Sequence, residues 1–491
     1  MKRLSKLIAV TLCLAAPAAA HVGSPDVYYE GNAGPYHLFV SIRVPQVVPG
    51  VAEIEVRSQS ADVRRVRMVP LRITGPGSEY SPVPDVAEQS KVDPQSFSGS
   101  LWLMEFGALQ VRILVDGTRG SGECSVPVLA EAQRVMPMQK PLGAILAALM
   151  ALLAAGLVTI AGAGAREATL DPGADPDRRN RLRGRVAMGV AAAVVLAAVV
   201  LGNQWWNVAA ASYARHVYRN PAVTAQLEPG QRLVLRSNDP AWIEGVKRQP
   251  LILDHDHLVH LFLIRTPAMD RFWHLHPQEV GSGAFAVGLP GVPPGHYRIF
   301  ADIVHSNGFP ETLVSAIDIP AGSQAPADAA LTGDDSAAEA PALEETGADT
   351  RVFTFPDGSG RMIWESPGSP VKANAAAQFR FRVEDSSGQP AMDLQPYMGM
   401  AVHAEIVRSD CAVFAHVHPA GSVSMAALEL ANSVVPDATV MPVMTMPSDS
   451  ERLGPEVSFP YGFPQAGRYR MFVQAKRRGG VETGVFDAQA R

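Results

Sequence analysis

The chain has 491 residues, a formal net charge of -6 and 3 cysteines. The net charge is mild and dense basic residues are confined to one short segment, so nucleic acid is not an expected partner. The cysteines are too few for a disulfide scaffold.

The N-terminus has the layout of a cleavable secretory signal. Three basic residues among the first six precede an apolar run from Leu7 to Ala16, and the small residues Ala18-Ala19-Ala20 follow. We therefore expect residues 1–20 to be removed as a signal peptide, which makes His21 the mature N-terminus.

Residues 21–135 alternate short β-branched or aromatic runs with Gly and Pro punctuation. Tyr36 to Val44 and Leu109 to Val115 are two such runs. This spacing predicts an exported N-terminal β-sandwich.

Two stretches without charged residues follow. They are long enough to cross a bilayer, so we expect transmembrane helices at 141–165 and 186–208. Residues 166–185 between them are rich in Arg, and short basic loops stay in the cytoplasm. The two large remaining regions then lie in the periplasm, anchored to the inner membrane.

Two further sandwiches are predicted after the helices, at 222–320 and 351–488. They are copies of each other, since the closing strand that begins at Gly295 matches the one that begins at Gly467. Residues 321–350 have almost no large apolar residue and cannot build a core. We expect this segment to be a disordered linker.

A histidine motif occurs once in each copy. His260 begins an apolar strand that leads to His274-Leu275-His276-Pro277, and His403 begins one that leads to His416-Val417-His418-Pro419. Residues two apart in a strand point to the same face, so each pair aims two imidazoles one way and the third arrives from the neighbouring strand. Three converging imidazoles suit a copper or zinc ion. The alternative is a hydrogen-bonded cluster that pins two strands.

The run from Glu384 through His403 to Pro419 resembles the YtkA-like family of exported β-sandwich domains, over residues 384–488. Residues 254–320 resemble a more divergent copy. The resemblance implies an immunoglobulin- or cupredoxin-like sandwich and suggests metal handling. The predicted fold is therefore mainly β, with three exported sandwiches of this kind and two transmembrane α-helices.

The two copies differ just before the motif. Alignment on the first histidine of each motif sets His255 opposite Met398 and His257 opposite Met400. Imidazole suits Cu(II) and Zn(II), whereas thioether selects Cu(I). Domains that differ in this way would hold the two oxidation states of copper, or pass the ion between sites.

The second copy carries an insertion from Met425 to about Gly454. It includes Met441, Met444 and Met446 in a Pro-rich setting. This spacing offers several thioethers to one soft ion, and the alternative is that the methionines serve as packing.

His21 is a further candidate ligand. After cleavage, its α-amine and ring would chelate one copper ion with His37 as a third nitrogen. This arrangement resembles the histidine brace of copper-resistance CopC-like proteins and of oxidative polysaccharide enzymes. The resemblance rests on the terminal histidine alone.

Signal removal leaves Cys124 and Cys411 in different exported regions. Cys411 falls in the predicted hairpin turn between the strands of His403 and His416, roughly 16 Å from His416 along an extended chain. We therefore expect it to be free or paired across domains, and not a blue-copper ligand.

The sequence contains no Gly-x-Ser-x-Gly elbow, His-Glu-x-x-His helix or phosphate-binding Gly loop. No catalytic residue is predicted, and binding is favoured over catalysis. The first hypothesis is an inner-membrane-anchored periplasmic protein that handles or delivers copper, with zinc as the second choice of ion. The alternatives are an envelope scaffold that docks another envelope protein, and a copper-dependent redox enzyme.

Overall fold

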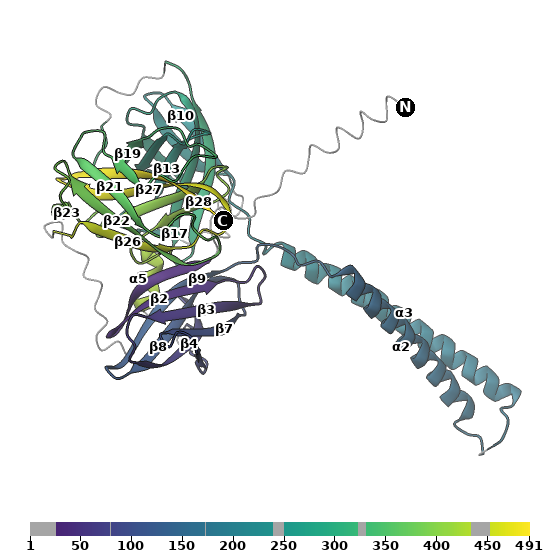
Figure 1. Cartoon of the computed structure of the whole chain (residues 1–491). Coiled ribbons are helices and arrows are strands. Elements are labelled where there is room, and N and C mark those ends of the chain that lie inside the picture. The colour runs from purple at the N-terminus through teal and green to yellow at the C-terminus, as the bar shows by residue number, and fades with distance from the viewer. Residues whose placement is uncertain (1–25, 79, 172, 239–249, 323–329, 434–451) are drawn as a thin grey trace. The chain divides into compact units, whose positions relative to one another are not determined.

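The computed structural model describes residues 26–78, 80–171, 173–238, 250–322, 330–433 and 452–491. They form two compact units, one built from the residues up to Glu131 together with Tyr218–Arg491, and the other from Ala132–Val217. The first unit contains six antiparallel sheets and the second contains two long helices (Figure 1). The predicted fold class, mainly β with three sandwiches and two long apolar helices, is confirmed.

The N-terminal sandwich stacks two sheets over one apolar core that includes Tyr36, Ile54, Phe97 and Ile113. Buried and exposed residues alternate along the whole of β3, as in a strand with one face in the core and the other in water. The first sheet has the order β1 (Val27–Ala33), β2 (Tyr36–Arg43), β3 (Gly50–Ser58), β7 (Ser96–Leu103), β6 (Glu88–Gln89). The second sheet has the order β5 (Asp85–Val86), β4 (Val63–Arg72), β8 (Gly107–Gly117), β9 (Gly120–Ala130).

The first repeat is a second sandwich, with a core that draws on both of its sheets, for example Leu235, Leu261, Phe285 and Tyr297. One sheet has the order β10 (Val223–Glu228), β11 (Arg232–Ser237), β16 (Ala284–Gly288), β15 (Gln278–Gly281). The other has the order β12 (Leu251–Ile252), β17 (Gly295–His305), β13 (His260–Arg265), β14 (Arg271–Leu275), β19 (Ser336–Glu339), and β18 (Pro310–Ile319) pairs with β17.

The second repeat has the same construction over a core that includes Trp364, Phe379, Ile406 and Met471. One sheet has the order β20 (Val352–Thr354), β21 (Gly360–Ser366), β22 (Ala377–Asp385), β26 (Glu456–Tyr461). The other has the order β23 (Leu394–Gln395), β27 (Gly467–Arg477), β24 (His403–Arg408), β25 (Phe414–Val417), and β28 (Gly480–Ala490) pairs with β27. Helix α5 (Met425–Ser433) follows β25.

The two repeats pack against each other through equivalent strands. Phe272 of β14 stacks on Phe472 of β27 with ring centroids 4.3 Å apart, and Phe300 of β17 stacks on Phe414 of β25 at the same distance. Phe272 and Phe414 are equivalent in the two copies, as are Phe300 and Phe472. These contacts are therefore reciprocal, as in a two-fold dimer, and the repeats form an internal pseudo-dimer.

The N-terminal sandwich is joined to the second repeat. The backbone N–H of Glu30 in β1 donates to the carbonyl of Ala420 at 3.0 Å, and Asn432 of α5 bonds both backbone groups of Ser125 in β9, at 3.0 and 3.1 Å. The loop that follows the second histidine motif is thus held by another domain.

Part of the expected disordered linker at 321–350 is ordered, which corrects that prediction. Residues 336–339 form the edge strand β19 beside β14, where Glu339 makes an ion pair with Arg271. Composition predicted disorder because the segment cannot build a core of its own. An edge strand needs only a partner backbone, which β14 supplies.

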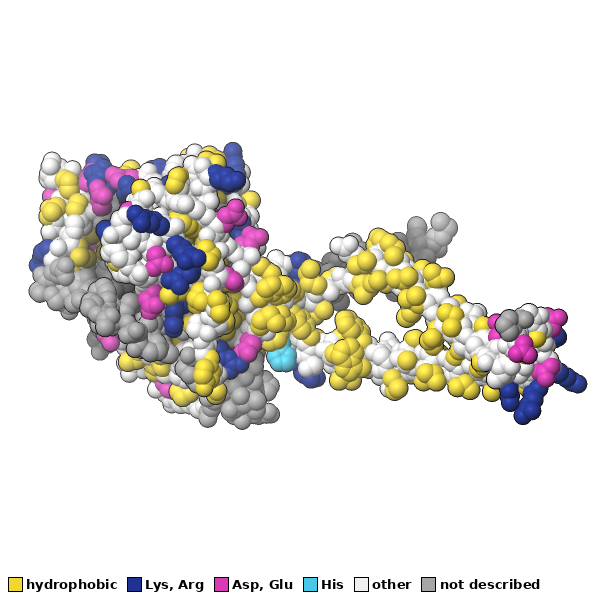
Figure 2. Space-filling view, turned by 90° about the horizontal axis from the view of Figure 1, so that it is seen from below, with side chains coloured by type: hydrophobic (Ala, Val, Ile, Leu, Met, Phe, Trp, Pro, Cys, Tyr) yellow, Lys and Arg dark blue, Asp and Glu magenta, His cyan; other side chains and the backbone are white. Residues whose placement is uncertain are grey.

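Helices α2 (Lys140–Glu167) and α3 (Arg178–Ala214) are long and apolar enough to span a membrane, and each contains an 18-residue stretch of high mean hydropathy, 2.5 in α2 and 2.3 in α3. They lie side by side, and hydrophobic side chains cover them while Lys and Arg gather at the end where they connect (Figure 2). A Cβ on Gly162 would lie 2.3 Å from Met188, so glycine permits this close approach.

The basic segment predicted as a loop at 166–185 is in large part helical. Helix α3 begins at Arg178, after Asp177, whose carboxylate accepts a hydrogen bond from the Asn180 N–H at 2.6 Å. This N-cap extends the helix beyond its apolar part. The arginines of the segment therefore lie mostly on the first turns of α3.

Candidate metal centre

Eight of the 13 histidines gather where the two repeats face each other. Six of them form two groups of three, and within each group the ligand atoms lie within 4.8 Å of one another. His257 and His416 lie beside these groups. The first group contains His260, His274 and His276, and the second contains His255, His403 and His418.

The first group is assembled as the strand pattern predicts. His260 is the first residue of β13, and His274 lies near the end of β14, two residues before His276. The strands pair with Leu261 opposite Leu275. The His260 ring therefore lies 5.4 Å from the His274 ring and 5.1 Å from the His276 ring, between centroids.

The ring protons of His260 and His274 are both engaged elsewhere. His260 donates its Nε2–H to the carbonyl of Asp254 at 2.9 Å, and His274 donates its Nδ1–H to Oε1 of Gln474 at 3.0 Å. The other nitrogens, Nδ1 of His260 and Nε2 of His274, carry lone pairs and yet lie 3.1 Å apart. Burial lowers the pKa of both rings well below the usual value, so neither ring holds a second proton to share.

A cation between these two nitrogens would remove the conflict. Two nitrogens bound to one zinc or copper ion lie roughly 3.0–3.4 Å apart, given metal–nitrogen distances of about 2.0–2.1 Å. His276 would supply a third nitrogen. Its Nδ1–H donates to Asp335 at 3.0 Å, and its buried Nε2 has no hydrogen-bond partner among the described residues. A carboxylate behind a metal-binding histidine fixes its tautomer in this way.

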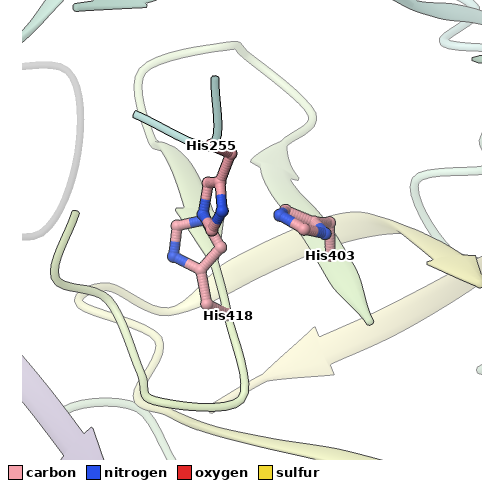
Figure 3. A group of neighbouring side chains, drawn as sticks. All are labelled: His255, His403 and His418. Carbon is pink, nitrogen blue, oxygen red and sulfur yellow. The ribbon is translucent and has the colours of Figure 1, made fainter. Parts of the chain in front are cut away.

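The second group draws on both repeats, which differs from the predicted set of His403, His416 and His418. His255 reaches across from the loop before β13, and its ring forms a triangle with those of His403, at the start of β24, and His418, after β25 (Figure 3). The ring centroids of His403 and His418 each lie 4.9 Å from that of His255. The second site is therefore an interface site.

A left-handed turn aims His255 across the interface. The residue has a φ of 52°, and backbone hydrogen bonds between Asp254 and His257 close the turn. Tyr397 and Met400 close the same turn in the second repeat. The two turns begin and end at aligned residues, so the backbone structure supports the alignment that sets His255 opposite Met398.

Buried ring nitrogens of the second group lack partners among the described residues: both nitrogens of His255, both of His403, and Nε2 of His418. The Met398 backbone lies near the His255 ring without the geometry of a hydrogen bond. His418 donates its Nδ1–H to the carbonyl of Val423 at 3.3 Å, so its Nε2 carries a lone pair. Burial lowers the pKa of all three rings. Neutral imidazole nitrogens are ready ligands for copper or zinc.

A fully buried carboxyl group, that of Glu405, lies between His274 of the first group and His416. Its Oε1 is 4.0 Å from Nδ1 of His274 and 4.0 Å from Nε2 of His416, and neither carboxylate oxygen has a hydrogen-bond partner in the described part of the chain. Burial raises its pKa well above the usual value, and the charge of Asp302 adds to this. A buried carboxyl group without a hydrogen-bond partner is costly, and its charged form is costlier still, so a cation nearby would stabilise the carboxylate form of Glu405.

The central histidines are each held by the opposite repeat. Gln474 of β27 accepts the Nδ1–H of His274, and Asp302 of β17 lies 3.4 Å from Nδ1 of His416. Gln474 and Asp302 occupy equivalent positions, since they pair with the first histidine of their own repeat. Formation of the centre is therefore coupled to docking of the repeats.

His257 and the aligned methionines lie at the margins of the centre. The His257 ring stacks on that of His276 at 3.7 Å, with Nε2 3.8 Å from Asp334. Met398 is buried near the His255 ring, whereas Met400 packs in the apolar core shared with the N-terminal sandwich. This packing argues against Met400 as a soft-metal ligand.

The other predicted ligands are not brought to the centre. Both ring nitrogens of His37 are engaged, with Asn32 at 2.8 Å and Glu30 at 3.0 Å. His21 and the methionines of the insertion lie outside the described residues, so the histidine brace and the thioether cluster stay predictions. These methionines are Met441, Met444 and Met446.

Cys124 and Cys411 are both free and buried. Cys411 lies in the turn between β24 and β25, as its spacing predicts, and packs in the apolar interface of the repeats. Burial raises its pKa to about 11 and that of Cys124 to about 12. Both thiols are thus protonated at neutral pH and poor ligands.

Sequence reasoning missed the polar residues that support the histidines. Asp335 lies in the segment predicted to be disordered, and Asp302 and Gln474 lie on β17 and β27, outside the repeated histidine motif. Glu405 did leave a signal, because it interrupts the buried strand β24, in which its neighbours Ala404 and Ile406 are apolar.

Residues 357–491 match a family described as a domain of unknown function, DUF8832. The resemblance of residues 384–488 to the YtkA-like family stays a prediction. No curated protein sequence matches the chain.

Several solved structures align with most of the chain, at low identities and low TM-scores. A tetra-tandem repeat from the extending region of a large adhesion protein is 9% identical, with 91% of this chain and 72% of that chain covered and a TM-score of 0.16. SGBP-B from a xyloglucan utilization locus of Bacteroides uniformis is 8% identical, with coverages of 94% and 98% and a TM-score of 0.18. The D1–D4 ectodomain fragment of ICAM-5 is 8% identical, with coverages of 92% and 77% and a TM-score of 0.15. At these scores the similarities carry no functional argument.

Proposed function

We propose that this protein binds transition-metal ions, copper ahead of zinc, at two neighbouring histidine groups between its repeats. The observation that carries the proposal is the 3.1 Å approach of Nδ1 of His260 to Nε2 of His274, both without an available proton. A metal ion satisfies both lone pairs at once. A purely structural cluster of neutral rings leaves them in repulsion.

The donor set supports a borderline divalent cation. Among the described residues, both groups consist of imidazoles, with the Glu405 carboxylate close by and no cysteine in either group. Imidazole suits Cu(II) and Zn(II), and Cu(II) stands highest in the affinity order of the divalent first-row metals. Copper is therefore the first ion to test.

The biological role that we propose is copper handling or delivery in the periplasm, from an inner-membrane anchor. Two helices long enough to span a membrane support the anchor, and the predicted signal peptide supports export of the sandwiches. The burial of both groups favours holding an ion over turning over a substrate, because catalysis needs an open coordination position.

Metal content and Cu(II) and Zn(II) titration of the full-length protein in detergent test the proposal. We expect two ions per chain, one for each group. The His274→Ala/His276→Ala/His403→Ala/His418→Ala variant should lose them. His296→Ala is the matched control, since its half-exposed ring pairs with Asp318 outside the centre.

Wild-type protein that binds neither ion under oxidising or reducing conditions would contradict the proposal and assign the histidines a structural role. Bound copper together with turnover of a reductant and oxygen would instead favour a redox enzyme. Retained binding in the quadruple variant would move the site elsewhere in the chain.

A further inference from the structure

The two histidine groups differ in how they are covered. Over the first group, the Tyr397 hydroxyl donates to the carbonyl of Asp334 at 2.7 Å, and the amide of Gln474 donates to Ser336 at 2.9 Å. The segment that leads into β19 is thereby fastened over this group. His274 is fully buried beneath it.

A cavity of about 160 Å³, partly open to solvent, reaches the second group instead. It lies where all three sandwiches meet, and each contributes to its wall. The lining includes Val27, Ala108 and Pro127 from the N-terminal sandwich, Asp302 and Glu311 from the first repeat, and His416 and His418 from the second. This volume has room for several water molecules, and hence for a hydrated ion.

The charge of the lining has one sign. It contains the carboxyl groups of Asp26, Asp254, Asp302 and Glu311, and none of the described Lys or Arg residues. A cleft lined by carboxylates raises the local concentration of cations and their rate of association. Entry of a positively charged ligand is therefore favoured.

Buried nitrogens at the cavity identify the ligand further. His416 and His418 both line it, and the Nε2 atoms of both have no hydrogen-bond partner in the described part of the chain. The His416 side chain is only 6% exposed and His418 is 2% exposed. Asp302 stands beside them, 3.4 Å from Nδ1 of His416, and accepts a hydrogen bond from Thr312 at 2.6 Å. A cavity that offers carboxylates in its wall and imidazole nitrogens with free lone pairs suits a divalent metal ion.

We propose that this cavity is the port through which a hydrated copper(II) or zinc(II) ion enters the second group, with the N-terminal sandwich forming one wall. The inference rests on the proposed metal binding and adds a route to it. The N-terminal sandwich thereby controls how fast the ion arrives, while the histidines control how tightly it is held.

Ala108→Trp in the full-length protein tests the port. The side chain lies on β8 in the lining and is not a ligand, so the bulkier residue fills the cavity from the N-terminal side. We expect Zn(II) loading to slow by about tenfold or more, within the range over which association rates vary among variants of one site. The equilibrium stoichiometry should stay at the wild-type value.

Val51→Trp is the matched control. Val51 is 40% exposed on β3 of the same sandwich and outside the lining, so a tryptophan there should leave loading unchanged. Wild-type loading should also slow as salt is raised, because the carboxylates are then screened.

Ala108→Cys covers the case in which the tryptophan disturbs folding. A bulky methanethiosulfonate reagent, added after folding, should slow Zn(II) loading, and removal with a phosphine reductant should restore it. Wild-type protein treated in the same way controls for the native thiols.

The outcomes separate the two proposals. Wild-type binding with an unchanged loading rate in both blocked Ala108 variants would overturn the port and leave the metal site standing. A wild-type protein that binds no Zn(II) or Cu(II) at equilibrium would overturn both. Slowed loading at unchanged stoichiometry supports the port.

Discussion

Glu405 occupies in the second repeat the place that Phe262 holds in the first. Phe262 pairs with His274 across β13 and β14, and Glu405 pairs with His416 across β24 and β25. Both side chains are fully buried. Phe262 packs on Phe414 with ring centroids 5.2 Å apart, whereas Glu405 places a carboxyl group beside two imidazoles. The duplicated position thus holds an apolar packing residue in one copy and an ionisable carboxyl group in the other.

Replacing this carboxyl group separates stability from metal binding. For Glu405→Leu we expect the metal-free protein to keep or gain free energy of unfolding, by up to roughly 1–3 kcal/mol, since a buried carboxyl group without a hydrogen-bond partner is removed. Affinity for Cu(II) should fall by about tenfold or more. Denaturant unfolding and metal titration of the same sample measure both. Lower stability with unchanged affinity would make Glu405 a structural residue.

His255→Ala tests the interface origin of the second group. The His255 ring is the one part of that group supplied by the first repeat. We expect binding to fall from two ions per chain to one, because His260, His274 and His276 stay complete. Metal analysis after dialysis gives the stoichiometry. If the variant still binds two ions, the second site would instead consist of His403, His416 and His418, as the sequence predicts.

Asp335→Ala tests the carboxylate behind the first group. Without its acceptor at 3.0 Å, the His276 ring loses its fixed orientation and tautomer. We expect metal affinity at this group to fall by about 10–100-fold. Asp318→Ala is the control, because Asp318 makes the same kind of contact with His296 at 2.7 Å, outside the centre. Equal, small effects of the two changes would contradict a supporting role for Asp335.

The alternating strand pattern of the sequence predicts the part of the centre that lies within one sheet. His260, His274 and His276 converge because residues two apart share a face and neighbouring strands pair in register. These rules act over one sheet. They say nothing of which sheet faces which, so the arrival of His255 beside His403 is not contained in either copy of the motif.

Other supporting residues escape sequence reasoning for a related reason. Asp335 belongs to a segment whose composition predicts disorder, because composition measures the ability to build a core and not the ability to add an edge strand. Gln474 and Asp302 are ordinary polar residues on strands. They gain their role only when the repeats dock and each side chain meets a histidine of the other copy.

Phe472→Ala tests whether docking of the repeats builds the metal centre. Loss of its stacking on Phe272 leaves a void at the interface and should cost about 3–5 kcal/mol in unfolding free energy. Metal affinity should fall as well, because Gln474 lies two residues further along the same strand. Phe459→Ala is the control, since the Phe459 ring stacks on Phe379 and Phe381 of β22, within the second repeat. Similar stability losses with weaker metal binding only in Phe472→Ala would support the coupling, and equal affinities would contradict it.

The stability of the metal-free protein should fall steeply as the pH drops below 6.5. Burial lowers the pKa of six histidines from this usual value: His255, His260, His274, His276, His403 and His418. The unfolded chain then binds protons that the folded chain does not, and each such histidine removes about 1.4 kcal/mol per pH unit. Glu405 acts in the opposite sense, because its raised pKa favours the folded state at low pH and this contribution is lost as the pH rises. One carboxyl group does not offset six imidazoles, so the free energy of unfolding still rises with pH from about pH 5 to pH 6.5.

Denaturant unfolding of metal-free protein across this range measures how steeply the free energy of unfolding depends on pH. A variant that lacks His260 and His403 should show a shallower dependence, and an equal dependence in the two proteins would place the titrating groups outside the centre.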